Sequence, residues 1–339
     1  MKVAVVILNW NGKDFLSRFL PSVLEHSAGV AEIVVADNGS ADDSVRLLED
    51  EFPSVRIIRF PENGGFSKGY NDALRQVEAE YYVLLNSDVE VTAGWLAPML
   101  EAMESDSRVG ACQPKVLCHH DKTKFEYAGG AGGYIDLFGY PFCRGRIFDE
   151  LETDRGQYDD QREIFWATGA CLFVRAELYH RLGGLDEDFF AHMEEIDFCW
   201  RMKNEGYKLL VCPSSAVYHV GGGALPKSSP RKTYLNFRNN LSLLIKNVPG
   251  KRLGWVLLTR YFLDALALFM FVSKGRWADA GAVWSAHSHF LRSLPRFWKK
   301  RKALRQGELT RIYHGSLVWA HFVHGVNVFE NLKPGKWRN

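Results

Sequence analysis

The chain has 339 residues, of which 47% are hydrophobic and 24% are charged. This composition is typical of a folded globular protein and excludes a disordered or collagen-like chain. The formal net charge of +2 is unevenly distributed, because residues 246–339 hold 17 Lys and Arg against 4 Asp and Glu. We therefore expect a main domain at residues 1–245 and a basic C-terminal extension at residues 246–339 that faces an anionic surface.

Strand and helix patterns alternate through the first part of the chain. Short apolar runs at residues 2–8, 33–36 and 55–59 are followed by helical patterns at residues 14–25, 42–51 and 67–77. Ser40 and Asp42 are candidate N-caps of the second helix. This alternation predicts an α/β fold with a doubly wound, mostly parallel sheet.

Polar sequences follow these apolar runs, where an open α/β sheet binds its ligands. They are Asn9-Trp10-Asn11-Gly12, Asp37-Asn38-Gly39-Ser40, Asn63-Gly64-Gly65-Phe66 and, after the run at residues 81–85, Asn86-Ser87-Asp88. A carboxylate such as Asp88 suits Mg²⁺ or Mn²⁺ holding a diphosphate. Taken alone, Asn86-Ser87-Asp88 is also explained as a turn or a helix cap. The first turn lacks Gly-x-Gly-x-x-Gly, which argues against an NAD(P) dehydrogenase.

An acidic cluster, Glu194-Glu195-Ile196-Asp197, follows an apolar and aromatic run at residues 188–193. Carboxylates beside apolar residues lose solvation and repel one another. We therefore expect one of them to have a raised pKa and to accept a proton near neutral pH. The alternative is a solvated acidic first turn of a helix.

Together with Val217-Tyr218-His219-Val220-Gly221, these motifs in this order resemble the family 2 inverting glycosyltransferases with a GT-A fold, over residues 1–245. The Asn86-Ser87-Asp88 form, in place of Asp-x-Asp, is most similar to the rhamnosyltransferase-like branch. The resemblance implies transfer of a sugar from a dTDP- or UDP-linked donor to a hydroxyl of a glycan or lipid-linked acceptor, as in surface polysaccharide assembly. A non-catalytic, membrane-associated scaffold that binds sugar nucleotides stays open as the alternative.

The resemblance also implies roles for individual residues. It makes Glu195 the general base, with Glu194 and Asp197 as catalytic neighbours. Asp88 and His219 would hold a divalent cation, Mg²⁺ or Mn²⁺. The implied donor-binding residues are Trp10, Asn11, Asp37, Asn63, Gly64, Gly65, Lys68, Asn71 and Asn86, and the implied acceptor-binding residues are Thr168, Gly169 and Glu194. Arg201 is placed to pair with Asp197 at i, i+4 spacing.

Between these motifs, residues 121–163 resemble a long connection, punctuated by glycines at 129–133 and a turn at 139–141. Long connections in compact domains are commonly lids or partly mobile segments, and a surface insertion without function is the alternative. We expect a strand with a central turn at residues 164–174 and a helix at residues 231–246.

The segment Leu253 to Val272 is apolar and long enough to span a bilayer. Arg260 and Asp264 interrupt it, and each costs ~3 kcal/mol near the bilayer centre, whereas each large apolar residue returns only ~0.5 kcal/mol. We therefore expect a helix that lies on the membrane, with Lys299-Lys300-Arg301-Lys302 meeting anionic head groups. A soluble helical cap is the alternative, and no motif accompanies the basic charge that would indicate nucleic acid as a partner.

The six cysteines form no Cys-x-x-Cys pair, so neither a zinc ribbon nor a disulfide framework is expected. The first apolar run is too short for a signal peptide. We expect a cytoplasmic protein that is peripheral at the inner face of the cell membrane.

Overall fold

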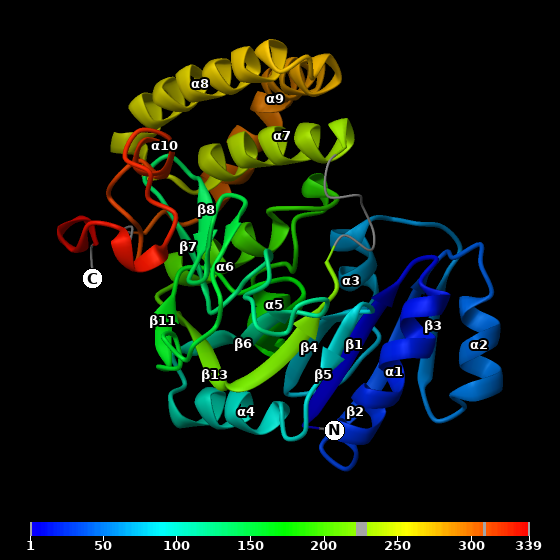
Figure 1. Ribbon diagram of the computed structural model, residues 1–339. Coiled ribbons are helices and arrows are strands. Elements are labelled where there is room, and N and C mark those ends of the chain that lie inside the picture. The colour runs from blue at the N-terminus through cyan, green and yellow to red at the C-terminus, as the bar shows by residue number, and fades with distance from the viewer. Residues whose placement is uncertain (1, 222–228, 308–309, 338–339) are drawn as a thin grey trace.

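A nine-stranded sheet forms the centre of the molecule (Figure 1). The computed structural model describes residues 2–221, 229–307 and 310–337. The strand order is β11-β13-β6-β12-β4-β1-β2-β3, and β5 lies alongside β13. The strands are β1 (Val3–Asn9), β2 (Ala31–Asn38), β3 (Arg56–Phe60), β4 (Tyr81–Asn86), β5 (Val89–Val91), β6 (Val109–Cys118), β11 (Arg162–Ile164), β12 (Cys171–Arg175) and β13 (Lys208–His219).

The sheet is parallel in its N-terminal half and mixed in the other half. β1 pairs in parallel with β2 and β4, and β2 pairs in parallel with β3. β12 runs antiparallel between β4 and β6, and β5 and β11 run antiparallel to β13. The predicted strand with a central turn at residues 164–174 is therefore two strands, β11 and β12, of which β12 inserts into the sheet against the direction of its neighbours.

Helices cover both faces of the sheet, which confirms the doubly wound prediction. Side chains of β1 alternate between the two faces: Val3, Val5 and Ile7 pack on one side and Ala4 and Val6 on the other. The first side is covered by α1 (Lys13–Ser27), α2 (Ser44–Glu51) and α4 (Leu96–Ser105). The second is covered by α3 (Phe66–Leu74), α5 (Ala176–Arg181) and α6 (Glu194–Asn204).

The two predicted caps of the second helix have different roles. Asp42 Oδ1 accepts the amide of Ser44, the first residue of α2, at 3.1 Å. Ser40 Oγ instead accepts the amide of Asn11 at 2.9 Å. Ser40 therefore ties the loop after β1 to the loop after β2, and only Asp42 contributes to the start of the helix.

Residues 121–163 contain a small antiparallel sheet. Its order is β10-β9-β8-β7, with strands β7 (Gly133–Ile135), β8 (Pro141–Cys143), β9 (Arg146–Ile147) and β10 (Glu150–Leu151). Phe142 and Ile147 are fully buried. Gly145 has a φ of 96°, and a Cβ there would lie 2.3 Å from the ring of Phe125. The sequence did not reveal this sheet, because strands of two or three residues leave no periodic signal.

The C-terminal helices stack above the second face of the sheet (Figure 1). They are α7 (Pro230–Asn247), α8 (Gly250–Ser273), α9 (Trp277–Ala303) and α10 (Leu317–Phe322). Ser229 accepts the amide of Lys232 at 3.2 Å and caps α7, and Pro230 occupies its first turn. The expected helix at residues 231–246 is thus confirmed, and the expected domain boundary at residue 245 falls within its last turn.

The end of the chain returns to the main domain. The amide of Leu317 donates to Asp136 at 2.7 Å, and the amide of Phe329 donates to Glu152 at 2.9 Å. Short 3-10 helices, η2 (Phe329–Asn331) and η3 (Pro334–Lys336), bring Phe329 and Trp337 against the ring of Tyr134. The extension and the sheet therefore share one hydrophobic cluster.

Candidate active site

The loops after β1 and β2 hold Asp37 in a fixed orientation. Asn9 and Asp37 are partners in the parallel ladder, and Asn9 Nδ2 donates to Asp37 Oδ1 at 3.1 Å. The other oxygen of Asp37 accepts the amide of Ser40 at 3.0 Å. Trp10, next to Asn9, is 47% exposed. Both residues therefore stay candidates for contact with the donor. Asp37 offers an oriented carboxylate, and Trp10 offers a solvent-exposed aromatic ring.

Asn11 has a structural role in the same loops. Its φ of 51° is a left-handed conformation that asparagine tolerates. Asn11 Oδ1 accepts the amide of Ala41 at 2.7 Å. Its side chain therefore joins the two strand-end loops, and a donor contact at the exposed Asn11 stays a prediction.

Hydrogen bonds and close packing fix the loop before α3, which holds Asn63, Gly64 and Gly65. Asn63 Oδ1 accepts from Asn38 Nδ2 at 3.0 Å and from the amide of Gly65 at 2.8 Å. Gly65 has a φ of 86°, and a Cβ there would lie 2.6 Å from the ring of Phe190. Glycine is thus required at position 65 by backbone conformation and by the approach of Phe190. A donor contact at Asn63, Gly64 or Gly65 stays a prediction.

The two α3 residues that were expected to contact the donor are already engaged. Asn71 is buried, accepts from the amide of Leu185 at 2.9 Å and from the hydroxyl of Tyr179 at 2.7 Å, and donates to Leu185 at 2.8 Å. Asn71 therefore anchors α3 to the segment before α6, and its assignment to the donor is corrected. Lys68 pairs with Asp72 on the surface at 2.5 Å.

Asp88 and His219 meet where β4 and β13 end. His219 Nε2 lies 3.1 Å from Asp88 Oδ1 and 3.5 Å from Asn86 Nδ2, and His219 Nδ1 lies 3.2 Å from Glu126 Oε2. Burial alone would lower the pKa of His219, but the carboxylates of Glu126 and Asp88 outweigh it and raise the pKa to about 10. Glu126 belongs to residues 121–163, where no motif marks it in the sequence.

Asp88 Oδ1 and His219 Nε2 are close enough to bind one divalent cation together once the imidazole has lost its proton, because a pKa of about 10 keeps His219 protonated at neutral pH. Two ligands at right angles, each about 2.1 Å from an octahedral ion, are about 3 Å apart, close to the separation of His219 Nε2 and Asp88 Oδ1. Glu126 lies on the opposite ring nitrogen, where it orients the imidazole instead of binding the same ion. Within the described residues, no group of three or more His, Cys, Asp or Glu side chains surrounds one point. Such an ion would need further ligands from a bound diphosphate.

The acidic pair at the start of α6 has the predicted electrostatics. Glu194 is buried, and Glu194 and Glu195 each have a buried carboxylate oxygen for which residues 2–221, 229–307 and 310–337 supply no hydrogen-bond partner. Burial raises the pKa of Glu195 to about 7. Burial and the charge of Glu195 raise the pKa of Glu194 well above its ordinary value. The raised pKa of Glu195 agrees with the expectation of an acid that titrates near neutral pH, and the burial of Glu194 argues against a solvated first turn.

The turn between β11 and β12 lies beside this pair. A Cβ on Gly169 would lie 3.7 Å from the Cβ of Glu195. The amide of Asn86 donates to the carbonyl of Ala170 at 3.0 Å, which joins the turn to the end of β4. The hydroxyl of Thr168 is buried, donates to the carbonyl of Ala128 and accepts the amide of Ala170. Thr168 is therefore structural, which corrects its assignment to the acceptor, whereas Gly169 stays a candidate.

Asp197 points away from the acidic pair. It accepts from Arg201 Nε at 2.8 Å, Lys246 Nζ at 2.7 Å and Asn247 Nδ2 at 2.8 Å. Burial alone would raise the pKa of Asp197, but the charges of Lys246 and Arg201 lower it. The predicted pair with Arg201 is confirmed, and the catalytic assignment of Asp197 is corrected, because its carboxylate is saturated by fixed donors.

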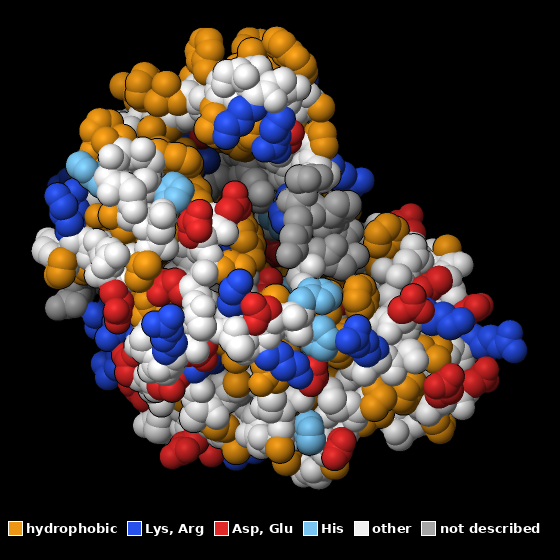
Figure 2. Space-filling model, viewed as in Figure 1, with side chains coloured by type: hydrophobic (Ala, Val, Ile, Leu, Met, Phe, Trp, Pro, Cys, Tyr) orange, Lys and Arg blue, Asp and Glu red, His pale blue; other side chains and the backbone are white. Residues whose placement is uncertain are grey.

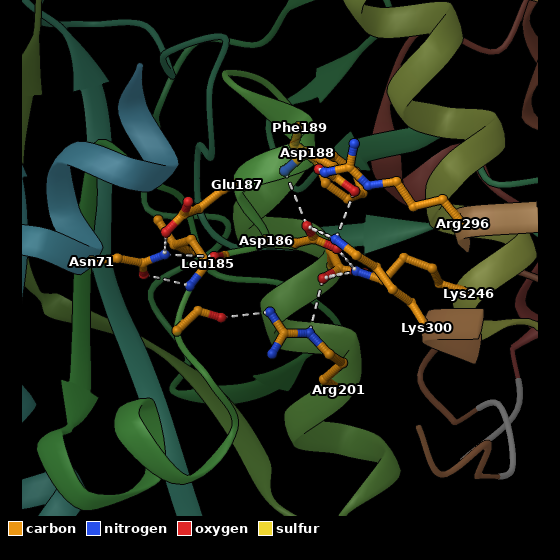
Figure 3. A network of polar contacts seen from close by, with 12 residues as sticks. Asn71, Leu185, Asp186, Glu187, Asp188, Phe189, Arg201, Lys246, Arg296 and Lys300 are labelled. Atoms are coloured by element: carbon orange, nitrogen blue, oxygen red, sulfur yellow. Dashed lines mark hydrogen bonds and ion pairs between the residues drawn. The ribbon is translucent and has the colours of Figure 1, made fainter. Parts of the chain in front are cut away.

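The segment before Glu194 is tied to the C-terminal helices (Figure 3). We call residues 186–193 the base loop; it includes the short helix η1 (Glu187–Phe189). Asp186 accepts from Lys246 Nζ at 2.6 Å and from Lys300 Nζ at 2.5 Å. Asp188 pairs with Lys300 at 2.7 Å and with Arg296. The sequence analysis missed these contacts, since their partners lie more than fifty residues further along the chain.

Arg260 and Asp264, the charged residues in the middle of α8, face the protein. Arg260 Nε donates to Asp264 at 2.7 Å, and Asp264 lies 3.0 Å from His287 Nε2 on α9. The opposite side of α8 exposes large apolar side chains, including Leu258, Phe262 and Phe269. Figure 2 shows hydrophobic side chains gathered along this helix. Among the described residues, α8 is the one helix with the length and composition of a membrane span.

The predicted basic cluster is only partly on the surface. Lys300 is engaged with the base loop, and Arg301 is buried and donates to the carbonyls of Ile245 at 2.9 Å and Val248 at 2.7 Å. Lys299 and Lys302 are exposed. The expectation that all four side chains meet lipid head groups is therefore wrong.

Comparison with known proteins identifies the family. The family model described as glycosyl transferase family 2 matches residues 4–183, more than half of the chain. The chain belongs to this family. This glycosyltransferase is 25% identical over 231 residues to an N-acetylglucosaminyl-diphospho-decaprenol L-rhamnosyltransferase of Mycobacterium tuberculosis, covering 63% of this chain and 75% of the relative.

Solved structures show that the fold is GT-A. A crystal structure of GalNAc-T7 with UDP, GalNAc and Mn²⁺ aligns with a TM-score of 0.58 at 19% identity, over 74% of this chain. The glycosyltransferase spans about half of that protein, 48%. A mannosyltransferase of Pyrobaculum calidifontis in complex with GDP-Man and Mn²⁺ aligns with a TM-score of 0.51 at 16% identity, over 89% of this chain and 84% of the other.

Proposed function

We propose that this glycosyltransferase transfers a sugar, with inversion, from a dTDP- or UDP-linked donor to a hydroxyl of a glycan or lipid-linked acceptor in surface polysaccharide assembly. The observation that carries the proposal is the raised pKa of Glu195, beside Gly169 and joined through Ala170 and Asn86 to the end of β4. This geometry supports a proton acceptor and a diphosphate site at the same edge of the sheet. The Mycobacterium tuberculosis relative, whose name gives a diphospho-decaprenol acceptor, supports the lipid-linked class.

In the proposed reaction, the acceptor hydroxyl gives its proton to the Glu195 carboxylate while its oxygen forms a bond to the anomeric carbon. The bond from that carbon to the diphosphate oxygen breaks, and the nucleoside diphosphate leaves with the electron pair. One displacement inverts the anomeric configuration. A divalent cation held by Asp88 and His219 would neutralise the negative charge that develops on the leaving group. Asp37 and Trp10 would orient the nucleoside.

We also propose that the enzyme is peripheral at the cytoplasmic face of the membrane, with α8 lying on the lipid surface. Because Arg260 and Asp264 pair inside the protein, they do not face lipid in this arrangement. Leu258, Phe262 and Phe269 stand outward from the same helix. A helix with one side packed on its own protein and the other apolar fits the interface better than the bilayer interior.

A panel of sugar nucleotides with Mn²⁺ tests the proposal. A donor that binds only the folded protein, at about 100 times its dissociation constant, adds ~2.7 kcal/mol of stability and raises the melting temperature. The stabilising donor is then incubated with lipid-linked and soluble acceptors, and release of nucleoside diphosphate is measured. Acceptor-dependent release supports the proposal. Stabilisation without release from any acceptor would instead identify a non-catalytic sugar-nucleotide-binding scaffold.

A further inference from the structure

The base loop has an unusual backbone. Phe190, His192 and Met193 have φ angles of 66°, 70° and 71°. Residues other than glycine rarely adopt this left-handed region, and they keep it only where their surroundings fix it. Met193 immediately precedes the acidic pair, so the conformation of this loop decides where Glu194 and Glu195 point. Some group outside the loop must therefore hold it.

Asn239 of α7 is placed to do so. Asn239 is 1% exposed, and its Nδ2 lies 3.0 Å from the carbonyl oxygen of Phe189, 2.8 Å from that of Ala191 and 2.7 Å from that of His192. Its Oδ1 accepts from Arg238 Nε at 2.8 Å. The side-chain amide of Asn239 therefore lies within hydrogen-bonding distance of carbonyl oxygens on both sides of Phe190.

The other side of the base loop meets the donor motif. The carbonyl oxygen of Phe190 accepts the amide of Phe66, the first residue of α3, at 2.9 Å. The ring of Phe190 lies against Gly65. The loop is thus fixed between α3 and α7. On α7, Arg238 Nη2 also donates to the carbonyls of Asp188 at 3.0 Å and Phe189 at 2.8 Å, so Asn239 shares this role with its neighbour.

We propose that Asn239 is a positioning residue, which holds the base loop so that Glu195 meets the acceptor hydroxyl. The proposal rests on the proposed function for its catalytic consequence. Asn239 touches neither substrate nor reacting atoms in this account, and it acts through the backbone of residues 189–192. Its loss therefore slows the chemical step while the donor site is kept.

The adjacent residue, Asn240, is a matched control. It is also 1% exposed on α7, and its Nδ2 also donates to a backbone carbonyl, that of Gly139. Its Oδ1 also accepts from an arginine, Arg260, at 2.6 Å. The two side chains thus have the same size, burial and type of partner. They differ in the backbone that they hold, since Asn239 Nδ2 lies against three carbonyls and Asn240 Nδ2 against one.

The experiment compares Asn239→Ala, Asn239→Asp and Asn240→Ala in the full chain by amide hydrogen exchange and by steady-state kinetics. We expect both Asn239 variants to exchange the amides of residues 189–197 at least about tenfold faster than Asn240→Ala does. A displacement of about 1 Å costs about 100-fold in rate. We therefore expect kcat to fall about 10- to 100-fold, with KM for the donor changed less than about threefold. Asn239→Asp keeps side-chain size and the acceptor for Arg238, so it stays informative if Asn239→Ala does not fold.

The inference is overturned if the Asn239 variants exchange residues 189–197 as slowly as Asn240→Ala, or if their kcat falls no more than that of Asn240→Ala. It is also overturned if KM for the donor rises as much as kcat falls. A wild-type protein without transferase activity would instead refute the proposed function. In that case the exchange comparison alone would still decide whether Asn239 holds the loop.

Discussion

Replacing Glu195 by glutamine keeps the volume of the side chain and removes the proton acceptor. A positioned general base contributes about 10²- to 10⁴-fold to the rate, so we expect kcat to fall by that factor with donor binding retained. Because burial raises the pKa of Glu195 to about 7 in the free protein, kcat/KM of the wild type should rise with pH through about 7. In Glu195→Gln this rise should be lost.

The same substitution should change how stability depends on pH. The pKa of Glu195 is about 7 in the folded protein, against an ordinary 4.5. A carboxyl with a raised pKa stabilises the fold most fully below pH 4.5, and that contribution is lost as the pH rises through about 7. The difference corresponds to about 3 kcal/mol. Between pH 5 and 9, Glu195→Gln should therefore lose less unfolding free energy than the wild type does.

The assay measures kcat and kcat/KM against pH, and urea unfolding against pH, for the wild type, Glu195→Gln and Glu194→Gln. Glu194 is the matched control because it is the adjacent acid in the same buried turn. A loss of less than tenfold for Glu195→Gln would refute the reasoning. A larger loss for Glu194→Gln would transfer the role of the base to Glu194.

Three further predictions concern Asp88, Gly65 and the exposed side of α8. Asp88→Ala should abolish transfer, and Mn²⁺ should not restore it, with little change in far-ultraviolet circular dichroism. Near-native turnover of this variant after chelator treatment would exclude a metal at Asp88. Gly65→Ala should lower the unfolding free energy by about 1–3 kcal/mol more than Gly183→Ala does. Both glycines have positive φ, but of the two only Gly65 has an aromatic ring within contact distance of the added Cβ. Equal losses would show that the ring of Phe190 moves aside without cost. Replacing the exposed apolar side chains of α8, Leu258, Phe262 and Phe269, with glutamine should weaken binding to phosphatidylglycerol vesicles. The loss should exceed that of the double variant Lys299→Gln, Lys302→Gln. Alkaline carbonate should release the wild type from the vesicles, and release by detergent alone would indicate a spanning helix.

Sequence reasoning succeeded where the signal is local. Apolar runs that end in polar motifs placed β1, β2 and β4 and the loops that follow them, because buried strands and their ends differ sharply in composition. The raised pKa of Glu195 followed from acids set beside apolar residues. The pair of Asp197 with Arg201 followed from helical spacing.

The wrong assignments of polar side chains have one physical cause, since partners distant in sequence decide where a polar side chain points. Asn71 and Thr168 have the residue types of a binding site, yet Leu185 and Ala128 occupy them. No sequence feature near residue 190 predicts that Asn239 hydrogen-bonds to the base loop. Likewise, Arg260 and Asp264 indicate a poor membrane helix in sequence, but the structure turns both away from its exposed side.

The measurement that tests the central claim most directly is proton NMR of the reaction with the stabilising donor, a lipid-linked acceptor analogue and Mn²⁺. The account predicts that the donor's anomeric signal disappears only when acceptor is present. It also predicts that the first glycoside formed has the opposite anomeric configuration. A product that retains the donor configuration, or a donor that stays unchanged with every acceptor, would contradict single-step transfer by this protein.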